Sequence, residues 1–139
     1  MTIDEAIREI CTSGEFDEFS YVFDDWWDVD QSISRARLPA IAHILPIGGV
    51  MSLRNSRVYD REQVAIAFFD KVPRDASGED QRITFERMKD AAIKFVRLAN
   101  ESGHFGAISA WNYSVIYNQL ASIVTGVMLT LEIEGEGVC

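Results

Sequence analysis

The chain has 139 residues, which is one domain's worth and long enough to bury roughly two-thirds of its unfolded surface. Its 47% hydrophobic and 25% charged residues exclude a disordered or fibrous chain. With 13 Lys and Arg against 22 Asp and Glu, the net charge of −9 repels a phosphate backbone and argues against tight, sequence-specific DNA binding.

Cysteine usage and the N-terminus indicate a cytosolic protein. Cys11 and Cys139 allow one disulfide at most, and they lack the Cys-x-x-Cys spacing of zinc and redox sites. The N-terminus lacks the basic start and apolar block of a signal peptide, and no apolar run approaches the roughly 20 residues of a membrane helix. We therefore expect a reducing compartment and no membrane association.

The pattern of residues 2–14 predicts a short amphipathic helix. Thr2 and Glu5 have the spacing of a capping box, and the apolar residues that follow recur on one helical face until Gly14. Residues 16–30 mix aromatic residues with carboxylates, which is typical of an extended segment whose rings dock while its acids stay hydrated. Within it, residues 20–24 are predicted to form a strand.

Three strands are predicted between residues 38 and 69. Residues 38–47 are apolar but contain Pro39 and Pro46, which cannot donate to a ladder, so we expect an edge strand that ends at Gly48 and Gly49. Residues 50–59 are the candidate returning strand of that hairpin. Residues 64–69 are apolar on both alternate faces, which is typical of a central strand covered on both sides.

Residues 73–80 carry turn and cap residues that introduce the longest predicted helix, residues 80–100. Its apolar positions recur at three- and four-residue steps and form one stripe for packing on the sheet. Gly103 is suited to a left-handed helix end. The stripe comprises Phe85, Met88, Ala92, Phe95 and Ala99.

The C-terminal part predicts a hairpin of two strands. Residues 107–117 alternate between two faces, a turn around residues 118–122 follows, and residues 123–134 alternate again. Thr130, Glu132 and Glu134 of the last strand are expected to face solvent or a neighbouring subunit. Its other face is expected in the core, with Ile123, Val127, Leu129, Leu131 and Ile133.

The order helix, strands, helix, strand, strand indicates an α+β fold rather than a doubly wound sheet. We expect a mixed, mostly antiparallel sheet with one long amphipathic helix packed on a face and a short N-terminal helix. Residues 1–139 are expected to form a single domain. Residues 1–37 supply the N-terminal helix and the acidic aromatic segment, and residues 38–139 supply the α+β core.

No combination of residues forms a complete catalytic or metal site. The carboxylates of residues 24–30 lack the Gly and Glu positions of a twelve-residue calcium loop, which favours a hydrated acidic segment. His43 lies in an apolar strand and His104 follows a helix end, and neither has a Cys or a second His at ligand spacing. Nucleophile-elbow and phosphate-loop motifs are missing as well. We therefore expect no enzyme activity, no cofactor and no metal.

The one basic region of this acidic chain surrounds Arg54 and Arg57, with Arg35, Arg37 and Arg61 nearby. These side chains could contact phosphate or pair with acids of a neighbouring copy. Ordinary surface charge is the alternative, because isolated surface ion pairs contribute only about 0–1 kcal/mol.

From residue 38 onward, the predicted strands and helix follow one another in a distinctive order. A strand punctuated by proline and glycine is followed by a central strand, a helix and two closing strands. The parts are Leu38-Pro39 with Leu45-Pro46-Ile47-Gly48-Gly49, residues 66–71, Asp75 and residues 83–95, and residues 120–133 with Thr125-Gly126-Val127. In this order residues 38–139 resemble the small tail-completion proteins of tailed bacteriophages and prophages, of the tail-terminator or head–tail joining class.

Proteins of that class are α+β subunits of rings, commonly hexamers, that cap the tail tube, join it to the neck and catalyse nothing. The resemblance therefore implies a homo-oligomeric structural protein of the virion, assembled in the host cytoplasm. Its partners would be tail-tube and neck proteins, and DNA would pass it without sequence-specific binding. The acidic, aromatic N-terminal third has no counterpart in the pattern. The candidate subunit-interface residues are Arg54, Arg57, Trp26, Trp27, Thr130, Glu132 and Glu134.

Two other classes stay open. A small cytoplasmic interaction module could bind a peptide or partner helix through an aromatic surface, because aromatic residues are enriched at interaction hot spots. That surface would consist of Trp26, Trp27, Trp111 and Tyr113. An enzyme would need a deep pocket that holds two or more of Asp24, Asp28, His43 and His104.

Overall fold

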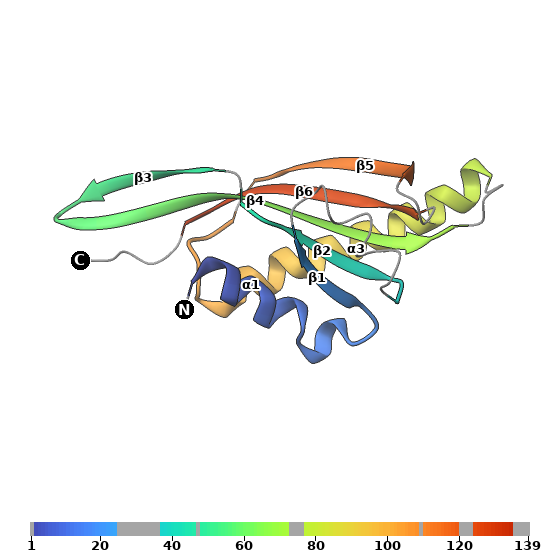
Figure 1. Ribbon diagram of the computed structural model, residues 1–139, viewed down its shortest axis with the longest axis horizontal. Coiled ribbons are helices and arrows are strands. Elements are labelled where there is room, and N and C mark those ends of the chain that lie inside the picture. Colours follow the sequence, from blue (N-terminus) through green and yellow to red (C-terminus); the bar gives the residue numbers. More distant parts are fainter. Residues whose placement is uncertain are drawn as a thin grey trace.

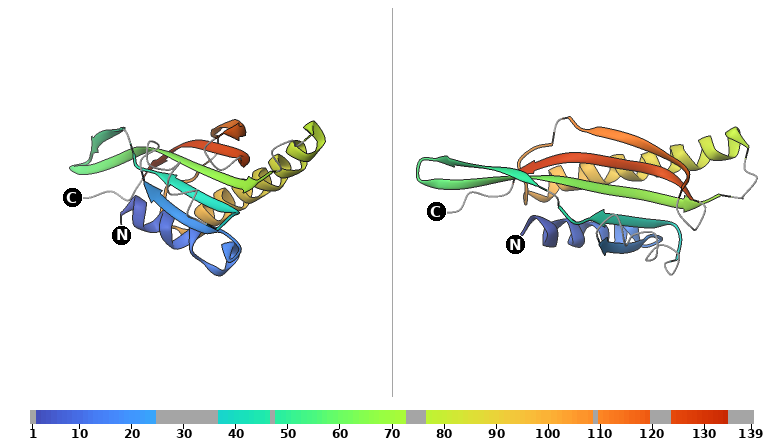
Figure 2. Two further views of the ribbon diagram at one scale, coloured as in Figure 1. Left: turned by 45° about the vertical axis from the view of Figure 1, so that its right-hand side comes forward. Right: turned by 45° about the horizontal axis from the view of Figure 1, so that its top comes forward.

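The computed structural model (Figure 1) describes residues 2–24, 37–46, 48–72, 77–108, 110–119 and 124–134. Within these residues a six-stranded sheet carries both α-helices on one face, and Figure 2 shows this layer from two further sides. The predicted α+β class, with a mixed sheet, one long helix and a short N-terminal helix, is confirmed.

Helix α1 (Ile3–Cys11) forms where the sequence predicts it. The Thr2 hydroxyl accepts a hydrogen bond from the Glu5 backbone N–H, and the Glu5 carboxylate accepts one from the Thr2 N–H, which completes the capping box. The apolar face of α1 is buried in the main core. A 3-10 turn, η1 (Gly14–Phe16), follows and adds Phe16 to the same core.

Helix α3 (Gly78–Ser102) extends two residues beyond the predicted range of 80–100 at each end. Ser77 and Asp80 form a second capping box at its start, and Gly103 ends it in the left-handed region at a φ of 75°. The predicted stripe packs against the sheet as expected, with Phe85 half-buried and the other members buried.

Six strands form the sheet. They span Ser20–Asp24 (β1), Ala40–Ile44 (β2), Gly49–Arg54 (β3), Arg57–Lys71 (β4), Asn112–Gln119 (β5) and Val124–Glu134 (β6). Their order is β1-β2-β4-β6-β5, and β3 pairs with β4 outside this path. The β1–β2 pair is parallel and the other described pairs are antiparallel, which makes the sheet mixed.

Two sequence predictions about β2 and β3 are wrong. Strand β2 is not an edge strand, because β1 and β4 flank it. Pro39 and Pro46 lie just outside its bounds, so neither removes a hydrogen bond from the ladder. Residues 50–59 do not return along residues 38–47. They contain most of β3, a turn and the start of β4, and β3 pairs with β4 instead.

Strand β4 is the central strand. Its 15 residues pair with β2 and β3 along one edge and with β6 along the other. Val64, Ile66 and Phe68 face the helices, Ala67 and Phe69 face the opposite side, and all five are buried. The prediction that this strand is covered on both faces is confirmed at these positions.

Strand β6 has the predicted register. Val127, Leu129, Leu131 and Ile133 lie in the main core beneath the helices, while Ile123 lies outside the described residues. On the opposite face Glu132 is exposed, and Thr130 and Glu134 are half-buried.

Gly126 lies where a side chain on β6 would meet the backbone of β4. A Cβ atom at this position would lie 1.8 Å from the backbone oxygen of Phe68 and 3.0 Å from the Cα of Phe69. Backbone on a central strand cannot give way as the end of a side chain can. The pairing of β4 and β6 at this register therefore requires glycine.

Strand β5 starts later than predicted. Residues 107–117 alternate in sequence, but the strand begins at Asn112. Ahead of it the Asn100 side chain pairs with the Ile108 backbone in both directions, donating from Nδ2 at 3.0 Å and accepting at Oδ1 at 2.8 Å. A side chain of α3 thus replaces the ladder partner that residue 108 would have in a strand. The predicted hairpin of the last two strands is confirmed by the antiparallel β5–β6 pair.

Candidate functional site

A two-residue turn joins β3 to β4 in a hairpin that projects past the rest of the molecule (Figure 1). Asn55 and Ser56 have φ values of 51° and 65°, the left-handed geometry of a type I′ turn, whose twist matches that of the flanking strands. Asn is among the residues that adopt this conformation most readily. We call residues 49–62 the arm.

One face of the arm carries exposed apolar side chains, and Asp60 lies on the same face opposite Met51. Met51 and Leu53 are 75% and 71% exposed, and Val58, which is opposite Leu53 in the register, lies on the same face. Since side chains alternate along a strand, this face continues the one on which Val64 and Ile66 are covered by the helices. The arm therefore prolongs the core face of the sheet beyond the helices that bury it.

The opposite face of the arm carries cations. Arg54 and Arg57 are directly opposite in the register, which is unfavourable for like charges. The Arg54 guanidinium turns toward the body, where it lies 3.8 Å from the centre of the Tyr59 ring and pairs with the Glu134 carboxylate. Arg61 joins the same carboxylate, with 3.5 Å between Nη2 and Oε2 of Glu134.

The structure brings some of the predicted interface residues together. Arg54 and Glu134 pair within one chain, and Glu132 lies 3.9 Å from Arg61 at their closest charged atoms. Arg57 is exposed beside the turn, and Thr130 is half-buried further along β6. Trp26 and Trp27 lie outside the described residues. The acid that meets Arg54 is thus supplied by the same chain.

A groove lies between α3 and the β5–β6 hairpin. It encloses about 250 Å³ and its wall is mostly apolar. Tyr113 is 49% exposed at this site, and the Lys89 ammonium lies 5.2 Å from the centre of its ring. The groove is lined by Lys89, Ala92, Ile93, Trp111, Tyr113, Val127 and Leu129. Two of the four residues of the predicted aromatic surface therefore share one site.

A polar cluster around a buried histidine lies between α1 and the sheet. The His43 ring is fully buried, with Nδ1 2.9 Å from the Tyr21 hydroxyl oxygen and Nε2 3.5 Å from Oδ1 of Asp4. The Phe23 ring stacks on it with 4.5 Å between ring centres. Glu62, at the base of the arm, contacts the same Asp4 carboxylate. Four elements, α1, β1, β2 and β4, therefore meet in this cluster.

Burial sets the protonation of the cluster. It lowers the pKa of His43 to about 4, against the opposing effect of the Asp4 charge, so the ring is neutral at pH 7. Burial also raises the pKa of Glu62 to about 7, and the charge and hydrogen bond of Asp4 act in the same direction. With the His43 proton on Nε2, the Tyr21 hydroxyl donates to Nδ1 and the ring N–H faces Asp4.

A hydroxyl, an imidazole and a carboxylate in line is an arrangement that hydrolytic enzymes use. Here the His43 ring is 0% exposed, so a substrate has no surface of the imidazole to approach. The geometry supports a structural tie between α1 and the base of the arm.

The Glu62→Gln substitution is expected to raise stability above neutral pH. The folded pKa of Glu62 lies above its ordinary value of 4.5, so its contribution is fully present below pH 4.5 and is lost as pH rises through about 7. Glutamine stays neutral beside Asp4. After allowance for solvent screening of this partly exposed group, we expect the variant to exceed the parent by about 1 kcal/mol at pH 8. Urea unfolding at pH 5 and pH 8 measures the difference.

Glu18→Gln is the matched control, since Glu18 is exposed and lies outside the cluster. This variant should follow the parent at both pH values. A Glu62→Gln chain that loses stability between pH 5 and pH 8 as steeply as the parent contradicts the assignment.

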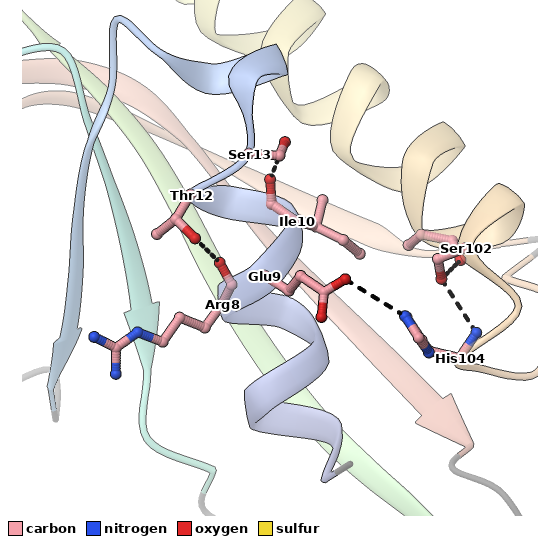
Figure 3. Close-up of polar contacts among 8 residues, drawn as sticks. Arg8, Glu9, Ile10, Thr12, Ser13, Ser102 and His104 are labelled. Atoms are coloured by element: carbon pink, nitrogen blue, oxygen red, sulfur yellow. Dashed lines mark hydrogen bonds and ion pairs between the residues drawn. The ribbon is translucent and has the colours of Figure 1, made fainter.

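His104 joins the ends of the two helices. Figure 3 shows its ring beside Glu9 of α1, with 3.9 Å between His104 Nε2 and Glu9 Oε1. Its backbone N–H donates to the Ser102 hydroxyl at 3.2 Å, and that hydroxyl donates to the Ala99 carbonyl at 2.7 Å. His43 and His104 thus contact different residues of α1, Asp4 and Glu9.

Neither a protein-family model nor a curated protein matches this chain. Within the residues that the structure describes, no group of three or more His, Cys, Asp or Glu side chains could hold a metal ion. None of the described helices is long and apolar enough to cross a membrane.

Sequence reasoning missed both the arm and the polar cluster. The arm had a local signal, because Asn55 and Ser56 are turn-forming residues between two segments rich in strand formers. The polar cluster had no local signal in the sequence, since Asp4, His43 and Glu62 are far apart in the chain and meet only through the pairing of strands.

Proposed function

We propose that the chain is a structural subunit of a tailed bacteriophage or prophage. In this role it forms a homo-oligomeric ring, a hexamer by resemblance, that caps the tail tube and joins it to the neck. It assembles in the host cytoplasm, becomes part of the virion and catalyses no reaction.

The apolar face of the arm is the observation that carries this proposal. A two-stranded ribbon is marginally stable alone, and exposed strand edges invite pairing with another chain. Large side chains such as Met51 and Leu53 are buried in most folded proteins, yet here they stand in solvent beyond the body. Burial against another subunit would cover them, as ring assembly requires.

The charge of the chain is compatible with a ring around DNA. At −9 per subunit, acidic groups that line a channel would keep passing DNA from adhering.

Native mass spectrometry is expected to give one closed oligomer of the parent chain and monomers of a Met51→Asp, Leu53→Asp double variant. Each apolar hot-spot side chain contributes about 2 kcal/mol to an interface, so the two changes should weaken self-association roughly 1,000-fold. The parent oligomer is also expected to bind tail-tube protein in a pull-down.

Ile83→Ser is the matched control, because Ile83 is an exposed apolar residue of α3 outside the arm. It should leave the oligomer intact, and circular dichroism checks that all variants fold. A parent chain that stays monomeric at every concentration and does not bind tail-tube protein would overturn the proposal.

A cytoplasmic interaction module is the second candidate, and the groove is the observation that favours it. Trp111 and Tyr113 line an apolar site whose Tyr113 ring is half-exposed. A monomeric chain that binds a helical or extended peptide, with quenching of Trp111 fluorescence, would support this alternative.

A further inference from the structure

We propose that the arm of one copy docks in the groove between α3 and the β5–β6 hairpin of a second copy. This inference deepens the proposed function and rests on it. It names the receiving surface, and it predicts that neighbouring subunits contact each other through two different faces.

The groove has the character of a site for side chains. Its wall is mostly apolar, and its volume of about 250 Å³ is below the range of about 300–1,000 Å³ that is typical of small-molecule sites. Such sites also need several convergent polar groups. The Lys89 ammonium instead lies over the rings of Tyr113 and Phe85, at 5.2 and 5.7 Å from their centres.

The arm has the matching character. Met51, Leu53 and Val58 present apolar side chains on one face of a narrow ribbon. Among the described residues β3 pairs only with β4, and β6 ends opposite Arg61, so residues 57–60 of β4 lack a partner on their other edge. Within the part of the chain that the structure describes, both edges of the ribbon are free, so it can enter a groove without first separating from its own sheet.

The arm cannot reach the groove of its own chain. Tyr113 is level with Leu129 and Ile66 across the sheet, nine residues along β4 from Arg57 at the turn. At about 3.3 Å per residue, the tip of the arm lies about 30 Å from the groove along a continuous strand. An arm that fills the groove must therefore belong to another molecule.

Charge favours a second copy as that molecule. The arm, residues 49–62, contains Arg54, Arg57 and Arg61 against Asp60 and Glu62, a net charge of +1, which leaves −10 on the rest of a chain with −9 in total. The exposed Glu86 lies in the same helical rows as Lys89 and Ile93, beside the groove. A basic arm is therefore attracted to the acidic body of its neighbour and repelled by a neighbouring arm.

This geometry dictates how the copies repeat. An arm that fills a groove on a different part of the next molecule makes a heterologous, head-to-tail contact, which leaves the pair with one free arm and one free groove. Repetition ends only when the last arm meets the first groove. The contact closes into a ring when the rotation between copies returns the last arm to the first groove, and a reciprocal exchange of arms between two copies is its smallest closed form.

Complementation between two variants tests the inference. The arm variant is the Met51→Asp, Leu53→Asp chain, and the groove variant is Tyr113→Arg, which places a long cation where a basic arm would dock. Each variant alone is expected to be monomeric in native mass spectrometry. An equimolar mixture is expected to form a 1:1 heterodimer and nothing larger, because one intact arm and one intact groove remain.

Ile83→Ser is again the control, as it alters α3 outside the groove lining and should leave the parent oligomer unchanged. Circular dichroism and thermal melting establish that both monomeric variants are folded. A groove variant that still forms the parent oligomer, or a mixture that stays monomeric, overturns the docking site while the ring proposal survives. A monomeric parent chain overturns the ring proposal itself.

Discussion

The Gly126→Ala substitution is expected to destabilise the protein by roughly 3 kcal/mol or more, or to prevent folding. The added Cβ would lie 1.8 Å from the Phe68 carbonyl oxygen, well inside any van der Waals contact. Gly126 pairs with Phe69 on one side and Ile116 on the other, so a shift of β6 to relieve the clash would disturb both ladders. The urea midpoint and the melting temperature of the purified variant measure the effect.

Gly78→Ala is the matched control for this prediction. Gly78 begins α3, and a Cβ there would meet nothing within 4 Å. Alanine also restricts the unfolded chain more than glycine does, so we expect an unchanged stability or a gain of up to about 1 kcal/mol. A Gly126→Ala chain within about 1 kcal/mol of the parent would mean that β4 and β6 do not approach as closely as the structure has them.

The protein is expected to lose about 3 kcal/mol of stability through His43 as pH falls from 6.5 to 4. Burial holds the folded pKa of this ring at about 4, below the ordinary value of 6.5. Below pH 6.5 the unfolded chain therefore binds the proton more readily than the folded chain, and stability falls until the folded ring is protonated near pH 4. His43→Gln should remove this acid dependence, as measured by urea unfolding between pH 4 and pH 7.

Glu62 has the opposite dependence between pH 4.5 and pH 6.5, because its contribution decreases as pH rises. The two effects partly cancel in the parent chain. The comparison is therefore made in a Glu62→Gln background, where the His43 effect stands alone. His104→Gln removes a histidine without touching the cluster and should keep the acid dependence of the parent. Equal acid sensitivity of His43→Gln and His104→Gln would contradict the burial of His43.

The elements that the sequence predicts well are those with signals inside one segment. Thr2 with Glu5, and Ser77 with Asp80, fix the starts of α1 and α3 through contacts three residues apart. The register of β6 likewise follows from alternation within the strand, because a one-residue slip would turn Leu129 and its companions to the other face.

Strand partners were harder to predict because pairing depends on residues far away in the chain. Pro39 and Pro46 suggested an edge strand, yet β2 ends before Pro46 and gains β1 on its far side through a parallel pairing that no local pattern signals. The polar cluster also depends on contacts between residues that are far apart in the chain. Burial of His43 was foreseeable from its apolar neighbours, but its contact with Asp4 depends on where α1 lies on the sheet.

For the candidate site residues too, the sequence shows some features, and others arise only when the chain is packed. The basic region around Arg54 was visible as composition, but its pairing with Glu134 arises because β4 and β6 run side by side to Arg61. The apolar face of the arm depends on where the helices stop covering the sheet. That boundary is a property of the packed molecule and not of residues 49–62.

Arm and core share one uninterrupted strand, which determines how the subunit carries mechanical load. The hydrogen bonds of an antiparallel ladder are perpendicular to the strands, so tension along β4 acts on them in shear. Pairing with β6 extends over eleven residues of β4, from Arg61 to Lys71, and these pairs share the force instead of opening one at a time. A subunit pulled by its arm would therefore pass the tension through the centre of its sheet, and the docked arm would slip from its neighbour before β4 left the fold.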